Sequence, residues 1–383
     1  MVQTANFRRI RFLATPLLLI TAVGLSLIIS EGILRLLFEK KDYLTPDLIS
    51  DKILGHKVAP GSGGHDAWGF RNKFVPKQAD IVAIGDSLTY GVSASAANSW
   101  PAILQRLTQK STYNMALGGY GPVQYSYLLE NKAVLLKPSS VIVGFYYGND
   151  LRDAFNTAYN NDYWKKLRST SDIRPDINYG PVSIHPIFLG SLREYLAHHS
   201  ILYASAMLSF GEVFRFLEMK YDTVEGVSVL EDPVKGVRTG FTGLTAEGQI
   251  KGLRLRDPAV KEGLRISLDL FLQMKRFCDT KGISFHVVLL PTKESVFSEY
   301  IDRDDTYLRD KRALRELLEN EREVDELVKR YFEQNYIVYV DVLKPLRNAI
   351  GKQIIYPTNQ DGHPNKNGYE IIAKTILAQL NNE

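Results

Sequence analysis

The chain has 383 residues, of which 45% are hydrophobic and 23% are charged, and its formal net charge is +4. This length and near-average composition are typical of a globular protein with a full hydrophobic core, and they exclude a disulfide-stapled miniature. A net charge this small does not imply a nucleic-acid partner, and we expect none. Cys278 is the single cysteine, so no intrachain disulfide can form, and apolar neighbours at helical spacing predict a buried, unreactive thiol.

The first feature along the chain is an uncharged apolar segment, residues 12–30. A helix needs roughly 20 such residues to span the hydrocarbon core of a bilayer. A cleaved signal peptide has a shorter apolar region and small residues at its cleavage site, so we predict an uncleaved transmembrane signal anchor rather than a cleaved leader or a buried core helix. Residues 1–11 contain three arginines. By the positive-inside rule they lie in the cytoplasm, which places the remaining chain on the periplasmic or extracellular side as a single-pass protein.

Residues 31–78 show no sustained periodicity and contain a turn-forming Pro-Gly-Ser-Gly-Gly run at 60–64. We therefore predict a tether here, followed by the main domain over residues 79–383.

The main domain alternates strand and helix patterns. Apolar runs of strand length occur at 81–84, 141–146, 285–290 and 337–340, with a weaker run at 112–115. Helical patterns lie between them at 100–107, 122–136, 260–278, 321–332 and 365–380. Continuous Val, Ile and Leu strands separated by helices indicate a parallel sheet covered on both faces. We predict a doubly wound, flavodoxin-like α/β fold with five parallel strands sandwiched by helices.

One stretch interrupts this alternation after the third strand. Residues 153–257 are far too many for an ordinary loop. They contain Tyr159, Tyr163 and Trp164, followed by an apolar segment at 192–221. We predict an insertion, which is either a cap over the strand ends or a structural elaboration remote from the ligand.

In an open α/β sheet, ligands bind beyond the carboxyl ends of the strands. The first strand is followed by Gly85-Asp86-Ser87-Leu88. Such a strand-to-helix turn can present a serine hydroxyl beside backbone N–H groups. By itself the tetrapeptide also fits a phosphate-binding turn or a helix cap.

Two further segments follow the second and third strands: residues 114–119, which end in Gly118-Gly119, and Gly148-Asn149-Asp150. A glycine N–H and an asparagine amide are suitable donors to an oxyanion, because neither blocks an approaching carbonyl group. Taken singly, each segment could serve only the geometry of a turn.

The fourth segment, Asp361-Gly362-His363-Pro364-Asn365, opens the last helical pattern. Histidine is suited to removing a serine proton near neutral pH, and a carboxylate on its other nitrogen fixes the tautomer. Six other histidines lack this setting: His56, His65, His185, His286, His198 and His199. Of these, only His198 and His199 remain candidate lid residues.

Together and in this order, the four segments resemble the SGNH (GDSL-type) hydrolase superfamily. The resemblance implies a serine nucleophile, a histidine base, an orienting carboxylate and three oxyanion donors. It implies that Ser87 is the nucleophile, His363 the base and Asp361 the carboxylate. The implied oxyanion donors are the Ser87 backbone, the Gly119 backbone and the Asn149 side chain, with Gly118 as the alternative to Gly119. Chemistry of this kind needs no metal or organic cofactor.

One feature departs from the family pattern: Asp361 precedes His363 by two residues, where three are usual. Periplasmic polysaccharide O-acetyltransferases related to this superfamily use an Asp-x-His pair, and residues 291–293 are similar to a segment in them, although there the pair precedes the serine block. The resemblance implies a serine esterase that cleaves a small-molecule or glycan ester, such as an O-acetylated carbohydrate or a lipid ester. The alternatives are an O-acyltransferase for an envelope polysaccharide and an inactive binding module of the same fold. A nucleotide-binding domain would leave Asn149 and the Asp361 and His363 pair unexplained.

Overall fold

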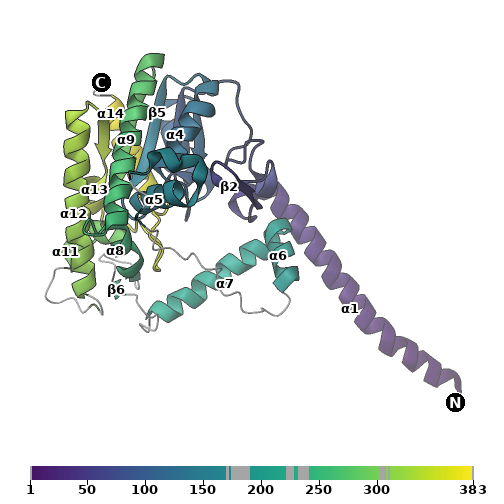
Figure 1. Ribbon diagram of the computed structural model, residues 1–383. Helices are drawn as coiled ribbons and strands as arrows, with labels where there is room; N and C mark the ends of the chain where they lie inside the picture. Colours follow the sequence, from purple (N-terminus) through teal and green to yellow (C-terminus); the bar gives the residue numbers. More distant parts are fainter. Residues whose placement is uncertain are drawn as a thin grey trace.

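A five-stranded parallel sheet forms the centre of the computed structural model, which describes residues 2–169, 172–173, 190–220, 228–231, 241–301, 308 and 311–381 (Figure 1). Its strands are β3 (Ile81–Gly85), β4 (Thr112–Ala116), β5 (Ser140–Tyr146), β8 (Ser284–Leu290) and β9 (Val338–Asp341). They lie in the order β4-β3-β5-β8-β9, and every neighbouring pair is parallel. This order confirms the predicted doubly wound, flavodoxin-like fold.

Helices flank the sheet because its strands are buried on both faces; every residue of β3 and all but the first of β8 are buried. Of the long helices, α3 and α14 pack against each other, whereas α4 and α5 both pack against α9. Apart from α6 and α7, which are described below, the α-helices that follow β3 are α2 (Ser87–Tyr90), α3 (Trp100–Thr108), α4 (Pro122–Asn131), α5 (Asp150–Asn160), α8 (Glu247–Leu253), α9 (Pro258–Lys281), α10 (Lys293–Val296), α11 (Ser298–Ile301), α12 (Lys311–Gln334), α13 (Leu343–Arg347) and α14 (Lys366–Leu380).

Helix α9 shows how the local sequence sets these boundaries. Asp257 caps its start by accepting a hydrogen bond from the Ala259 N–H, and Pro258 occupies the first turn. Gly282 ends it with a φ of +66°. Cys278 is fully buried within this helix, as predicted, and burial raises the pKa of its thiol to about 12.

The N-terminal helix α1 (Val2–Leu37) projects from the domain as a long rod (Figure 1). Its part Thr15–Leu37 is long and apolar enough to cross a membrane, and no other described helix is. Helix α1 is longer than the expected span of 12–30, because apolar residues such as Ile33 and Leu37 continue the pattern past Glu31 and Arg35.

Residues 38–78, within the predicted tether, fold onto the main domain. Strands β1 (Leu48–Asp51) and β2 (Gly55–Val58) form an antiparallel hairpin, and Leu54, Val58 and Phe70 join the hydrophobic core. These apolar residues are buried one at a time rather than as a helix or strand face, which is why no period marks them. The short 3-10 helices of the chain are η1 (Lys40–Asp42), η2 (Ser62–Gly64), η3 (Ala96–Asn98), η4 (Ala133–Leu136) and η5 (Asp162–Leu167).

The predicted insertion begins inside α5, whose residues Ala154 and Ala158 are buried against α4 and α9 and belong to the core. Its remaining described elements are α6 (Gly190–His199), α7 (Ile201–Lys220), β6 (Ser228–Glu231), β7 (Phe241–Leu244) and α8. Helix α7 begins against α1, because the Glu31 carboxylate accepts hydrogen bonds from the Ile201 and Leu202 N–H groups.

Candidate active site

Ser87 stands where β3 turns into the short helix α2. The Asp86 carboxylate caps this helix by accepting a hydrogen bond from the Leu88 N–H at 2.9 Å. Only glycine fits at position 85, since a Cβ there would lie 2.2 Å from the Thr89 hydroxyl. The turn therefore holds the serine hydroxyl at the carboxyl edge of the sheet.

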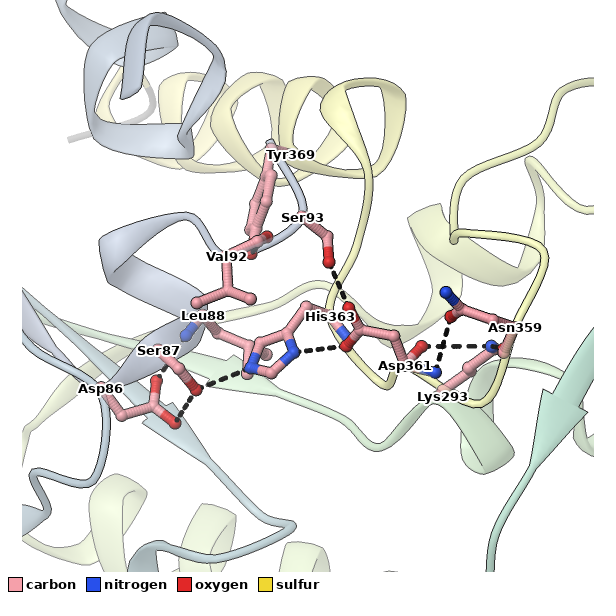
Figure 2. Close-up of polar contacts among 10 residues, drawn as sticks. All are labelled: Asp86, Ser87, Leu88, Val92, Ser93, Lys293, Asn359, Asp361, His363 and Tyr369. Carbon is pink, nitrogen blue, oxygen red and sulfur yellow. Dashed lines mark hydrogen bonds and ion pairs between the residues drawn. The ribbon is translucent and has the colours of Figure 1, made fainter. Parts of the chain in front are cut away.

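His363 brings the C-terminal segment onto Ser87 (Figure 2). Its Nε2 lies 2.7 Å from the Ser87 Oγ, and its Nδ1 lies 2.5 Å from the Asp361 Oδ1. The first distance is that of a hydrogen bond, and the second contact joins the imidazole to a carboxylate, a pairing typical of charge-assisted hydrogen bonds. The three side chains that the sequence singles out are thus in line, ready for proton transfer from the serine to the imidazole.

Asp361 reaches the histidine ring despite the two-residue spacing. Its Oδ1 also accepts a hydrogen bond from the His363 backbone N–H at 3.0 Å, which closes a tight side-chain turn. Gly362 between them is outside the left-handed region, and a Cβ there would have only ordinary contacts, the nearest at 3.6 Å. The turn therefore depends on the Asp361 carboxylate and not on any conformation that only glycine adopts at position 362.

The same carboxylate is ionised at neutral pH. Burial by itself would raise its pKa, but hydrogen bonds from His363 and from the Ser93 hydroxyl outweigh burial and lower the pKa of Asp361 to about 2. A fixed negative charge at Nδ1 stabilises the imidazolium that forms when His363 takes the serine proton.

A buried lysine supports the loop that carries this pair. The Lys293 ammonium, fully buried, donates to the carbonyl groups of Asn359 at 2.7 Å and Asp361 at 3.1 Å (Figure 2). The Asn359 Oδ1 accepts the Asp361 N–H at 2.8 Å. Residues 291–293 thus contribute a support for the acid and base rather than a group at the serine.

Two of the three expected oxyanion donors, Gly119 and Asn149, line one cavity of about 630 Å³. Gly119 has a φ of +79°, a backbone conformation that favours glycine. Gly118 is also close to the nucleophile, since a Cβ at that position would lie 3.6 Å from the Ser87 Cβ. In the described part of the chain, the N–H groups of Ser87 and Gly119 have no acceptor, so both are free to bind an oxyanion.

The sequence did not indicate His56 as part of this site, yet its ring lies against Gly118 and Gly119, which form the oxyanion segment. Its Nε2 lies 3.0 Å from the Gly118 carbonyl oxygen, and its ring packs on Tyr120. In a trans peptide the C=O and N–H bonds point in opposite directions, so fixing the Gly118 carbonyl also fixes the direction of the Gly119 N–H. His56 comes from β2, where neither periodicity nor a motif marks it.

Asn114, in the second segment, has a structural role. Its Nδ2 donates to the Thr89 carbonyl at 2.9 Å and its Oδ1 accepts the Ala116 N–H, which ties the end of β4 to α2. Two carboxyl groups near Ser87 are fully buried: Asp86, which caps α2, and Asp150, which begins α5. Burial raises the pKa of Asp86 to about 6 and that of Asp150 well above its usual range.

The remaining described histidines do not join this constellation. His65 is buried against Tyr90, at 2.8 Å from its hydroxyl, and burial lowers its pKa. His198 pairs with Asp47 at 3.0 Å and His199 with the Tyr195 carbonyl, both at the end of α6. His286 is buried in β8, and His185 lies outside the described residues. No cluster of three or more His, Cys, Asp or Glu side chains that could hold a metal occurs in the described ranges.

No protein-family model matches the chain, and no curated protein matches it significantly. Among solved structures, an acetylxylan esterase from Geobacillus stearothermophilus is 10% identical with a TM-score of 0.38, over 80% of this chain and 95% of that one. A GDSL-like lipase from Bacteroides thetaiotaomicron is 9% identical with a TM-score of 0.35, over 79% and 87%. An α/β hydrolase from the metagenome of Lake Arreo is 13% identical with a TM-score of 0.35, over 79% and 95%. Identities and TM-scores this low carry no weight in assigning a function.

Proposed function

We propose that the chain is a serine esterase of the SGNH (GDSL-type) superfamily that cleaves its substrate through an acyl-enzyme on Ser87. The observation that carries the proposal is the unbroken line of contacts from the Ser87 Oγ to His363 at 2.7 Å and from His363 to Asp361 at 2.5 Å. A phosphate-binding turn or a plain helix cap would require neither contact.

In the first half-reaction, the Ser87 Oγ attacks the acyl carbon while its proton passes to the His363 Nε2. The carbonyl oxygen becomes an oxyanion, which accepts hydrogen bonds from the Ser87 and Gly119 N–H groups and the Asn149 amide. Each such donor typically contributes about 10²- to 10³-fold in rate. Collapse of the tetrahedral intermediate breaks the bond to the alcohol, which leaves with the proton from His363.

In the second half-reaction, water attacks the acyl-enzyme and gives its proton to His363. The new intermediate collapses to release the carboxylic acid, and the proton returns to the Ser87 Oγ. Throughout, the Asp361 carboxylate holds the imidazole in the tautomer that accepts at Nε2.

The test is hydrolysis of p-nitrophenyl acetate by the full chain in detergent. Ser87→Ala should abolish enzymatic release of p-nitrophenol, while Ser139→Ala, at an exposed serine whose hydroxyl donates to the Asp80 carbonyl, should leave it unchanged. Substantial turnover by Ser87→Ala, with melting behaviour equal to that of the wild type, would refute the proposal.

A second candidate function uses the same acyl-enzyme but transfers the acyl group to a sugar hydroxyl of an envelope polysaccharide. The Asp361-x-His363 pair and its Lys293 support favour it, because the sequence likeness to O-acetyltransferases lies in these residues. With an acetyl donor and a soluble glycan acceptor, a transferase should form acylated glycan faster than free acetate, and an esterase should do the reverse.

We also propose that residues 12–30 anchor the protein in a membrane, with residues 1–11 in the cytoplasm and the domain from residue 79, including the insertion at 153–257, on the other side. The exposed apolar part of α1, Thr15–Leu37, supports the anchor, and the arginines within residues 1–11 support the direction. A reporter fused to the C-terminus should be digested by protease added to intact spheroplasts; its protection would refute this topology.

A further inference from the structure

The insertion contains a second apolar helix, α7, which starts where the expected membrane span ends. Glu31 is the first residue after that span. Its carboxylate accepts hydrogen bonds from the Ile201 N–H at 3.1 Å and the Leu202 N–H at 2.9 Å. These N–H groups belong to the first turn of α7, which has no acceptors of its own for them. With α1 in the bilayer as proposed, α7 therefore begins at the membrane interface on the side of the main domain.

Further contacts hold this junction at the base of α1. The Arg35 guanidinium pairs with Glu31 at 2.7 Å and also donates to the His199 carbonyl. The Thr45 N–H donates to the Ala197 carbonyl at 3.0 Å. Residues on both sides of the end of α1 thus bind the last turn of α6, directly before α7. The position of α7 is therefore fixed relative to the membrane-spanning helix.

The first half of α7 has no charged residue and carries an exposed apolar face. Residues 201–211 are uncharged. Met207, Leu208 and Phe210 are 40%, 55% and 60% exposed. At about 100° per residue these three side chains lie on one half of the helix, and Ser209 lies on the other. Exposed apolar faces of this kind mark surfaces that bind protein or membrane.

Lipid fits this face because the face continues the membrane-spanning surface. Beside the start of α7, Ile33 of α1 is itself exposed and apolar, so the two helices meet with apolar side chains open to the surroundings. Helix α6 adds the exposed Leu192 and Tyr195 to the same junction. Tyrosine is enriched at membrane–water interfaces, where its ring lies among the lipid headgroups. A helix in this position can bury its apolar face in the boundary between headgroups and acyl chains.

Helix α7 also lies on the active-site side of the sheet. It contacts β7, and the Gly243 N–H of β7 donates to the Asn359 carbonyl at 3.1 Å. Asn359 belongs to the loop that carries Asp361 and His363. In Figure 1, α7 diverges from α1 and passes below the sheet, at the end where α8 and β6 lie. A membrane that contacts α7 therefore lies nearer to the carboxyl edge of the sheet than to its amino edge.

We propose that α7 lies in the bilayer interface with Met207, Leu208 and Phe210 among the lipids, and that this contact turns the active-site edge of the domain toward the membrane surface. The proposal goes beyond the esterase function and rests on the proposed membrane anchor. It makes part of the insertion at 153–257 a membrane contact.

The experiment places one environment-sensitive fluorophore, nitrobenzoxadiazole, on the full chain in vesicles of phosphatidylcholine and phosphatidylglycerol. Cys278 is fully buried and the pKa of its thiol is raised to about 12, so wild type serves as the unlabelled blank. Leu208→Cys and Phe210→Cys report on the apolar face, and Ser209→Cys is the matched control on the opposite side of the helix. All three positions are exposed, so the substitutions carry little risk to folding. Leu135→Cys, at an exposed leucine before β5, reports on the amino edge of the sheet.

Labels at 208 and 210 should emit at shorter wavelength than the label at 209, and lipids with a nitroxide on the acyl chain should quench them about twofold more. The label at 135 should emit as in water and escape quenching. Labels at 208 and 210 that emit as in water would overturn the proposal. Labels there that are shielded from water but not quenched would also overturn it, because protein rather than lipid would then cover the face. Quenching at 135 equal to that at 210 would overturn the orientation.

A label on α1 distinguishes this proposal from the membrane anchor on which it rests. Leu25 lies within the expected span and is exposed, so a label on Leu25→Cys should be quenched strongly. Quenching at 25 without quenching at 208 and 210 would overturn the interfacial role of α7 alone. Absence of quenching at 25 would refute the anchor and, with it, this proposal.

Discussion

Replacing Asp361 by Asn tests whether this carboxylate acts on the His363 ring or only shapes the loop. The Asp361 Oδ1 accepts both the His363 backbone N–H and the ring Nδ1–H, so one atom of the Asn amide must face both groups. With the amide oxygen there, the turn and the tautomer are kept, but the charge that stabilises the imidazolium is lost. With the NH₂ group there, the amide donates to Nδ1, and the ring carries its proton on Nε2 and cannot accept the proton of Ser87.

The size of the effect follows from that change of tautomer. Loss of the correct tautomer in a serine triad lowers kcat by about 10⁴-fold, and we expect a fall of about 10³- to 10⁴-fold here. If Asp361 were only a cap, its loss would cost about 0.5 to 2 kcal/mol of stability and little turnover of folded enzyme.

The assay is kcat for p-nitrophenyl acetate, with the melting temperature recorded in parallel. Ser93→Ala is the matched control, since it removes the hydrogen bond to the other carboxylate oxygen and leaves the ring contact in place. We expect that control to lose roughly tenfold to a hundredfold in kcat, the effect of one hydrogen bond to a charged group, and thus less than Asp361→Asn. A kcat for Asp361→Asn within a few-fold of wild type would refute the assigned role.

Three further predictions concern the rest of the site. His56→Phe keeps the packing on Tyr120 but removes the hydrogen bond to the Gly118 carbonyl, so kcat for p-nitrophenyl acetate should fall about tenfold with little change in KM. An unchanged kcat would show that His56 does not position the Gly119 N–H. Asn149→Ala should lower kcat by about 10²- to 10³-fold. The melting temperature should hardly change, because this side chain does not cap α5. A large fall in melting temperature together with the loss of kcat would argue against an oxyanion role. The pKa of Asp361 is lowered to about 2, so the stability that its charge contributes is present above pH 4 and is lost as the pH falls from about 4 to 2. Over that window, urea titrations should show wild type losing roughly 1 to 2 kcal/mol more than Asp361→Asn. Equal losses in the two proteins would contradict the lowered pKa.

The sequence predicted the five strands of the sheet well because most of them are apolar runs bounded by polar residues. The observed strand Ile81–Gly85 extends the predicted 81–84 by one glycine, and Ser284–Leu290 adds one residue to 285–290. Helix α12 begins at Lys311, ten residues before the predicted helical pattern at 321–332. Strand ends then indicated where Ser87 and His363 should lie.

The features that could not be predicted from the sequence depend on single residues that belong to no periodic pattern and to no local motif. Leu54, Val58 and Phe70 bury one at a time, so the folding of residues 38–78 onto the domain was not visible. His56 reaches Gly118 across 62 positions of sequence, and no local pattern distinguishes it from a surface histidine. Whether Asp361 could reach its histidine depended on a side-chain turn that spacing alone does not determine.

The central claim is that Ser87 is an activated nucleophile, and covalent labelling tests it most directly. The full chain in detergent is treated with a fluorophosphonate, digested and analysed by mass spectrometry. We predict one phosphonylated serine, in the peptide that contains Ser87, and loss of this label in His363→Ala, because the hydroxyl at 2.7 Å from Nε2 is activated only by that ring. Absence of label on folded wild-type protein, or a label that persists in His363→Ala, would contradict the account.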